Sequence, residues 1–180
     1  SDAEGLNTIV EDIKTKGGKA SGHLLNAAED KVIEDLITHT EEHVGPIEVV
    51  IYNLGVQIGN RTLEDTSEKA FELGWRLATF GLFRVATAVC PLMEERGTGT
   101  LLVTSATAAV RGNAGQHAHA AAMGGRRMLC QTLNAQYASK GIHVAHILID
   151  GAVDAPDTLG KMLGAEQFQK LRESVGARDG

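Results

Sequence analysis

Three short apolar runs predict the strands of one parallel sheet. They cover residues 47–52, 100–104 and 142–149, and each is bounded by Gly, Pro or polar turn residues. The last two runs lack a strict alternation of apolar and polar residues, which is typical of strands that are covered on both faces. We expect a further short strand at residues 19–25.

Apolar residues at helical spacing predict that the intervening segments are helices. The expected helices cover residues 3–16, 29–43, 67–93, 116–140 and 158–175. The helix at 67–93 is apolar on nearly every side, so we expect it to be covered on two sides. Strands that alternate with helices predict an α/β fold, because parallel strands need a helical crossover between them.

The expected sheet also predicts where a ligand binds. In open α/β sheets ligands bind outside the carboxyl ends of the strands. This rule places residues 104–107, 117–123 and 150–157 around one crevice, where we expect the chemistry of the protein. The chain has no phosphate-binding P-loop and no G-x-G-x-x-G motif, and Ser105 is not part of the G-x-S-x-G elbow of the α/β-hydrolases.

Composition and charge exclude several classes of function. With 180 residues, 43% hydrophobic and 22% charged, the chain is expected to form a single globular domain over residues 1–180. Its formal net charge of -6 argues against nucleic acid and anionic membranes as partners. No apolar run reaches the length of a membrane span, so we expect a cytoplasmic protein.

Several titratable residues fall in segments that are predicted to be buried. Cys90 and Cys130 lie in expected helices, which indicates two reduced, buried thiols. His143 and His146 lie in an expected buried strand, where neutral imidazoles are typical of a core.

Two pairs of histidines have the spacing of metal ligands. His39 and His43 belong to an H-x-x-E-H pattern, which occurs in one class of zinc peptidase. They stand at the end of an expected helix, where His also interacts favourably with the helix dipole. His117 and His119 form the second pair, but no Cys or acidic cluster is near them. We therefore expect no metal site.

Short motifs follow one another at the ends of the expected strands. One strand ends in residues 51–55 (Ile-Tyr-Asn-Leu-Gly), a second covers residues 99–106 with Ser-Ala at its end, and a third covers residues 141–154 with a turn at Asp-Gly. Taken in order, from about residue 18 to residue 156, they resemble the short-chain dehydrogenase/reductase family. The resemblance implies a Rossmann-like three-layer sandwich with a parallel sheet, in which the N-terminal βα unit and its glycine-rich loop are missing.

The resemblance also implies a cofactor, NAD or NADP, and the residues near it. They correspond to the family's adenine contact, the Asn-Asn-Ala-Gly strand end, the catalytic lysine and the turn that embraces the nicotinamide. The corresponding residues are Asn26, Ala27, Asn53, Leu54, Gly55, Met123, Gly151 and Val153.

The departures from the family pattern fall on the catalytic residues. By alignment His119 stands in place of the tyrosine, Met123 in place of the lysine and Ala106 in place of the serine, with Ser105 directly before it. Imidazole titrates near roughly 6.5, whereas tyrosine needs a neighbouring cation to act as an acid–base group near neutrality. His119 and Ser105 are therefore the candidate catalytic residues.

Three functions remain open on this reading. By resemblance the chain is an NAD(P)-linked oxidoreductase of a small carbonyl or hydroxyl substrate. It can also be a catalytically inactive binding or assembly module of the same fold, or a non-redox enzyme that uses His119. The helices expected at 67–93 and 116–140 correspond to those that form dimer interfaces in the family, so we expect a homodimer or homotetramer.

The order of strands in the family raises a question of pairing. It separates the strand expected at residues 19–25 from that at 47–52 by two strands that this chain does not contain. Because buried backbone groups are rarely left unpaired, we consider two arrangements. Either the strand at 19–25 pairs directly with that at 47–52, or residues of a longer protein fill the gap.

Overall fold

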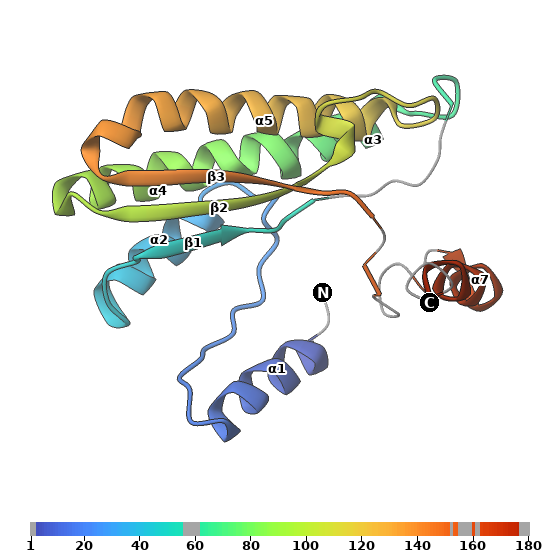
Figure 1. The fold of residues 1–180 in the computed structure, drawn as a ribbon. Coiled ribbons are helices and arrows are strands. Elements are labelled where there is room, and N and C mark those ends of the chain that lie inside the picture. The colour runs from blue at the N-terminus through green and yellow to red at the C-terminus, as the bar shows by residue number, and fades with distance from the viewer. Residues whose placement is uncertain (1–2, 56–61, 152, 155–159, 161–162, 177–180) are drawn as a thin grey trace.

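The computed structural model describes residues 3–55, 62–151, 153–154, 160 and 163–176. At its centre lies a parallel sheet in the order β1-β2-β3 (Figure 1). The strands are β1 (Val49–Tyr52), β2 (Gly99–Ala106) and β3 (Ile142–Ile149). In their register Ile51 is opposite Leu102, which is in turn opposite Ala145. These strands confirm the predicted Rossmann-like α/β fold.

Helices connect the strands as the sequence predicts, and Figure 1 shows α4 and α5 running side by side over one face of the sheet. The stretch predicted at 67–93 is one helical run with a π-helical turn in its middle, so we treat its three parts as separate elements. The helical elements are α1 (Ala3–Thr15), α2 (Val32–His43), α3 (Glu68–Trp75), the π turn η1 (Arg76–Phe80), α4 (Gly81–Arg96), the 3-10 turn η2 (Thr107–Ala109), α5 (His117–Tyr137), the 3-10 turn η3 (Ala138–Lys140) and α7 (Ala165–Gly176).

The core lies between the sheet and the layer formed by α4 and α5. Its largest fully buried side chains come from α4 and from the inward face of β2 and β3: Leu82, Val89, Cys90, Met93, Leu101, Val103 and Ile142. The opposite face of β1 carries Val49 and Ile51, which are 52% and 66% exposed. Cys90 and Cys130 are both free and buried, as predicted.

The helical run from Glu68 to Arg96 is long and apolar enough to cross a membrane by length and composition alone. Half of its most apolar window is buried inside the protein, and α4 supplies the core residues Leu82 and Val89. This burial is what a core helix of a globular protein shows.

The strand predicted at residues 19–25 is wrong. These residues form an irregular, extended segment without a sheet partner, and Leu24 is 54% exposed. A strand needs a neighbour for its backbone groups, and this polar segment contains Gly22 and too few apolar residues to anchor it to the sheet. The arrangement in which residues 19–25 pair with β1 is therefore wrong as well.

Two predicted helix boundaries also differ. Residues 29–31 precede α2 in a turn that ends at Lys31, whose φ of 67° lies in the left-handed region, and the helix begins only at Val32. The C-terminal helix was expected as one run over residues 158–175, but it is interrupted at Gly164, whose φ is 80°, and α7 begins at Ala165. The expected start at residue 158 lies outside the described residues. Both differences fall at helix ends, where local turn geometry competes with helical periodicity.

Candidate functional site

A small cavity of about 230 Å³ opens at the carboxyl ends of the three strands, next to the first turns of α5. Its lining residues come from the segment after β1, the ends of β2 and β3, and one face of α5: Asn53, Gly55, Thr104, Ser105, Ala106, His119, Met123, Arg126 and Ile149. Five of the residues predicted for the site therefore meet in one place. Their catalytic and cofactor-binding roles stay predictions.

Ser105 and Met123 face each other across this cavity. Ser105 is 7% exposed and lies on the face of β2 that is covered by helices. Its Oγ lies 3.5 Å from the sulfur of Met123, which is 4% exposed. A thioether is a weak acceptor, so the serine hydroxyl is held loosely and can turn to a better acceptor.

His119 lies in the first turn of α5 and lines the same cavity. Its side chain is partly buried, whereas that of His117, two residues earlier, is exposed. Successive turns of α5 bring His119, Met123 and Arg126 onto one face of the helix, because residues three or four apart are neighbours there. An imidazole, a thioether and a guanidinium thus follow one another along the wall of the cavity.

Hydrogen bonds join the end of β1 to β2 beside the cavity. The hydroxyl of Thr104 donates to the side-chain oxygen of Asn53, in a short hydrogen bond. It also lies 3.4 Å from the backbone oxygen of Tyr52. Asn53 thus follows β1 in a fixed position. Of the described residues, only Arg126 comes within 4 Å of the place where a Cβ of Gly55 would be, with its guanidinium at 3.9 Å. The backbone at Gly55 therefore stays open to a ligand.

Among the described residues that line this cavity, Arg126 alone has a permanent positive charge, and it is only 2% exposed. Its Nε donates to the carbonyl of Ala78 at 3.0 Å, and Nη1 donates to that of Thr104 at 2.7 Å. Nη2 donates to the carbonyl of Leu54 in a short hydrogen bond. Burial lowers the pKa of Arg126 from its ordinary value, but a guanidinium stays charged near neutral pH.

The π turn η1 presents backbone carbonyls to this arginine and to its neighbour Tyr52. The Tyr52 hydroxyl donates to the carbonyl of Leu77, one residue before the Ala78 carbonyl that Arg126 uses. Gly81 permits the approach, because a Cβ there would lie 2.2 Å from the Tyr52 oxygen. Burial raises the pKa of Tyr52 to about 12, so the phenol is neutral and is no acid–base group at physiological pH.

Sequence reasoning missed Arg126. A charged residue inside a predicted helix is usually assigned to its solvated face, whereas here the guanidinium points into the protein. The signal that could have found it is its spacing, because Arg126 follows Met123 by three residues and therefore shares its helix face.

Five of the predicted cofactor residues do not line the cavity. Asn26 and Ala27 lie in the turn before α2, where the Asn26 side chain is occupied by Glu29 and by the backbone of Ala28. Gly151 and Val153 follow β3, and Val153 is 63% exposed. The fifth residue outside the lining, Leu54, contributes its carbonyl to Arg126.

The H-x-x-E-H histidines are on the surface, away from this cavity. The rings of His39 and His43 stack at 4.5 Å, and His23 meets His39 edge-on at 5.5 Å. Nδ1 of His43 is hydrogen-bonded to the backbone oxygen of His39 at 3.0 Å, so one ring nitrogen is already engaged. Within the described ranges no group of three or more His, Cys, Asp or Glu side chains is arranged to hold a metal ion.

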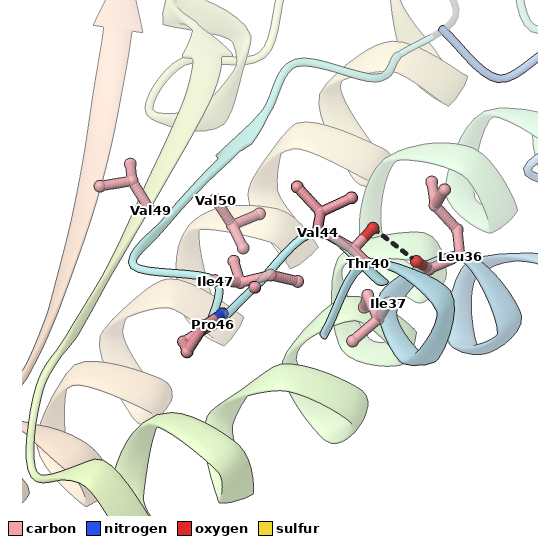
Figure 2. Close-up of a pocket in the computed structure, with 9 residues that line it drawn as sticks. Leu36, Ile37, Thr40, Val44, Pro46, Ile47, Val49 and Val50 are labelled. Carbon is pink, nitrogen blue, oxygen red and sulfur yellow. Dashed lines mark hydrogen bonds between the residues drawn. The ribbon is translucent and has the colours of Figure 1, made fainter. Parts of the chain in front are cut away.

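A second hollow, of about 610 Å³, lies between the end of α2 and β1. Figure 2 shows its lining, in which apolar side chains such as Leu36, Val44 and Ile47 predominate. Its Thr40 hydroxyl donates to the carbonyl of Leu36 at 2.7 Å. Since no titratable side chain lines it, this hollow has no groups for acid–base chemistry.

Comparison with known proteins shows the family of the chain, which spans less than two thirds of the length of the curated relatives named here. The family model of the short chain dehydrogenases matches residues 1–159. The chain is 25% identical over 156 residues to the 3-oxoacyl-acyl-carrier-protein reductase FabG of Pseudomonas aeruginosa, covering 87% of this chain and 62% of the reductase. It is 30% identical over 135 residues to the peroxisomal multifunctional enzyme type 2 of Mus musculus, covering 75% of this chain and 18% of that enzyme.

Solved structures show the same likeness. The structure superposes on a short-chain dehydrogenase from Rhodopseudomonas palustris with a TM-score of 0.77 and 30% identity, covering 82% of this chain and 68% of that one. For a gluconate 5-dehydrogenase from Burkholderia cenocepacia, solved with NADP and tartrate, the TM-score is 0.77 at 23% identity, over 88% and 62% of the two chains. With its parallel sheet, its matching motifs and a family model that covers most of its length, the chain belongs to the short-chain dehydrogenase family.

Proposed function

We propose that the chain acts as an NAD(P)-linked oxidoreductase on a small carbonyl or hydroxyl substrate, with His119 as its acid–base group. The observation that carries this proposal is the convergence of Ser105, His119 and Met123 on one cavity at the carboxyl ends of the sheet. Family membership supports the reaction class, and two structural neighbours were solved with NADP and with NAD+.

The residues of the cavity fit the nicotinamide end of such a cofactor in part. Asn53, Gly55 and Met123 line the cavity, and the missing side chain at Gly55 leaves its backbone accessible. Met123 cannot form the hydrogen bonds to ribose that a lysine forms at this position in the family. When bound, the reduced cofactor supplies the hydride that a carbonyl carbon accepts.

The chain's own residues then have two tasks. The Ser105 hydroxyl exchanges its weak contact with the Met123 sulfur for the carbonyl oxygen of the substrate, which it orients. Protonated His119 gives its proton to that oxygen as the carbonyl becomes an alkoxide, and the product is the alcohol. In the opposite direction neutral His119 accepts the hydroxyl proton.

The test is the pH dependence of turnover in both directions, at millimolar NADH or NADPH with small aldehydes and ketones. Reduction needs the imidazolium, so its rate should fall as the pH rises through a single ionisation, and oxidation should show the opposite dependence. His119→Ala should lower both rates by about 10² or more. The matched control is His117→Ala, because His117 is exposed and does not line the cavity. Equal loss in both variants, or an unchanged rate in His119→Ala, contradicts the proposal.

The second candidate is a binding or assembly module of the same fold without turnover. The buried thioether of Met123 favours it, since a side chain without charge or strong donors stands where the family has its lysine. This candidate predicts that neither NADH nor NADPH is oxidised with any small carbonyl compound, while the chain still recruits a partner. The non-redox enzyme that uses His119 predicts turnover without a nicotinamide cofactor.

A further inference from the structure

Arg126 is a buried charge that has no counter-ion among the described residues. It is 2% exposed, and in the described part of the chain no carboxylate lies within ion-pair distance of it. Its neighbours Tyr52 and Cys130 are neutral, because burial raises the pKa of Tyr52 to about 12 and that of Cys130 to about 11. Arginine is almost never fully buried unless it is paired with an anion, so we expect an anion to bind beside Arg126.

The guanidinium of Arg126 has N–H groups that can donate hydrogen bonds to such an anion. Of its five N–H groups, three are used by the carbonyls of Leu54, Ala78 and Thr104. One N–H on each terminal nitrogen is left over by these bonds, and Arg126 lines the cavity. Two parallel N–H groups are the geometry that binds a carboxylate in bidentate fashion.

The three carbonyls also fix the guanidinium in place. They come from the segment after β1, from the end of β2 and from the π turn η1, so three separate elements hold one planar group. The Arg126 guanidinium carbon also lies 5.1 Å from the centre of the Tyr52 ring. A donor group held this way loses little conformational freedom when a ligand binds.

Its place on α5 relates Arg126 to the loss of the lysine. Met123 and Arg126 are three residues apart on one helix face, and both line the cavity with Ser105. The positive charge of the site is thus one helical turn further along α5 than in the family pattern. From there it can neutralise a substituent of the substrate that lies beside the reacting carbon.

We propose that Arg126 is the substrate-binding cation of this cavity, and that it selects small hydroxy or oxo acids through their carboxylate. The cavity of about 230 Å³ is smaller than the roughly 300–1,000 Å³ of sites for drug-sized ligands, which fits a small acid. The reaction of that acid rests on the proposed oxidoreductase function, whereas the binding of its carboxylate does not.

Binding of lactate and of its neutral isostere lactamide to the chain tests this proposal. Both are titrated at constant ionic strength, with calorimetry and thermal unfolding as readouts. Lactate should bind with saturation and raise the unfolding temperature, and lactamide should do neither. Arg126→Gln should weaken lactate binding by about tenfold or more, the effect of losing hydrogen bonds to a charged group. The matched control Arg127→Gln removes the same charge at the next residue and should leave binding unchanged.

Other outcomes overturn the proposal. Equal binding of lactate and lactamide, equal loss in the two arginine variants, or binding of inorganic phosphate without lactate would each do so.

If Arg126→Gln does not fold, Arg126→Lys replaces it. An ammonium keeps the positive charge but lacks the two parallel N–H groups of the guanidinium, so weaker lactate binding is again expected. Lactate binding without any NAD(P)-dependent turnover, measured in the longest native form of the protein, supports this inference and contradicts the oxidoreductase. Turnover that shows no preference for acids over neutral ketones supports the oxidoreductase and contradicts the selection of acids by Arg126.

Discussion

The hydroxyl of Ser105 lies 3.5 Å from the sulfur of Met123, in the wall of the cavity at the carboxyl ends of the strands. This contact shows that the two side chains pack against each other. Both side chains are more than nine-tenths buried, and the cation of the site comes from Arg126 on the same helix.

Met123→Lys should destabilise the protein. The new ammonium would lie in a position that is 4% exposed, one helical turn from the buried charge of Arg126, in a cavity that no described carboxylate lines. Burying such an unpaired charge costs about 2–4 kcal/mol, measured as the free energy of unfolding in urea. Met123→Leu is the control that conserves volume, and it should cost less than about 1.5 kcal/mol. Equal stability of the lysine variant and the wild type would contradict the charge arrangement.

Restoring the family pattern should increase reductase activity. In the triple variant His119→Tyr, Met123→Lys and Ala106→Ser, the lysine lowers the pKa of the new tyrosine, so that it acts as an acid–base group nearer neutral pH. Activity is followed as the oxidation of NADPH or NADH with a small ketone, in the longest native form of the protein. Undetectable turnover in the triple variant would show that more than these side chains separates the chain from active relatives.

Much of the fold follows from periodicity, but the site depends on contacts between distant segments. The runs that become β1, β2 and β3 are bounded by turn residues, and the carboxyl-end rule correctly grouped Ser105 with His119. Residues 19–25 were assigned to a strand because local propensity says nothing about whether a sheet neighbour exists. Arg126 was missed because its acceptors lie far from it in the sequence. One of them, the carbonyl of Ala78, belongs to a π turn that the sequence pattern does not predict.

Stability should fall in mildly acidic solution because of His146. Its Nε2 is buried and has no hydrogen-bond partner in the described part of the chain, and burial, with Arg127 and Arg126 nearby, lowers its pKa. Since its pKa is lower in the folded protein, the unfolded chain takes up the proton first. The contribution of neutral His146 is therefore complete above roughly pH 6.5 and is lost as the pH falls below it. His146→Asn should flatten the dependence of unfolding free energy on pH between about 8 and 5.5, and His143→Asn, at an exposed position, should not.

The exposed aromatic side chains of α3 and α4 predict self-association. Phe71 and Trp75 are each 43% exposed and Phe83 is 51% exposed, while Phe80 stacks on both Trp75 and Phe83. A surface of this kind favours a two-fold interface. In sedimentation at micromolar concentration the wild type should be a dimer or tetramer, and Phe83→Glu should shift it toward the monomer.

The control for this prediction is an equally exposed apolar residue elsewhere. Leu24 is 54% exposed and lies in the irregular segment before α2, so Leu24→Glu should leave the assembly unchanged. Association should also move the Trp75 emission to shorter wavelength, because it removes the indole from water. A monomeric wild type whose Trp75 emission is already that of a buried indole would contradict the interface.

The outer edge of β1 leads to the last prediction, which concerns cofactor affinity. Within the described residues β1 is hydrogen-bonded to β2 alone. Val49 and Ile51 are largely exposed, and Val49 lines the apolar hollow of Figure 2. An unpaired apolar edge is a place where another strand adds to a sheet. We therefore expect residues of a longer protein to pair there.

A strand at this edge would also complete the cofactor site. A dinucleotide's pyrophosphate binds at the glycine-rich turn and helix N-terminus that follow such a strand, and this sequence contains no G-x-G-x-x-G. We predict that these 180 residues bind NADH or NADPH weakly or not at all, whereas a longer native form binds it more tightly. The measurement is a titration of NADH fluorescence against both forms. Micromolar binding by the short chain would contradict the prediction, because it would require a phosphate site built from the residues present.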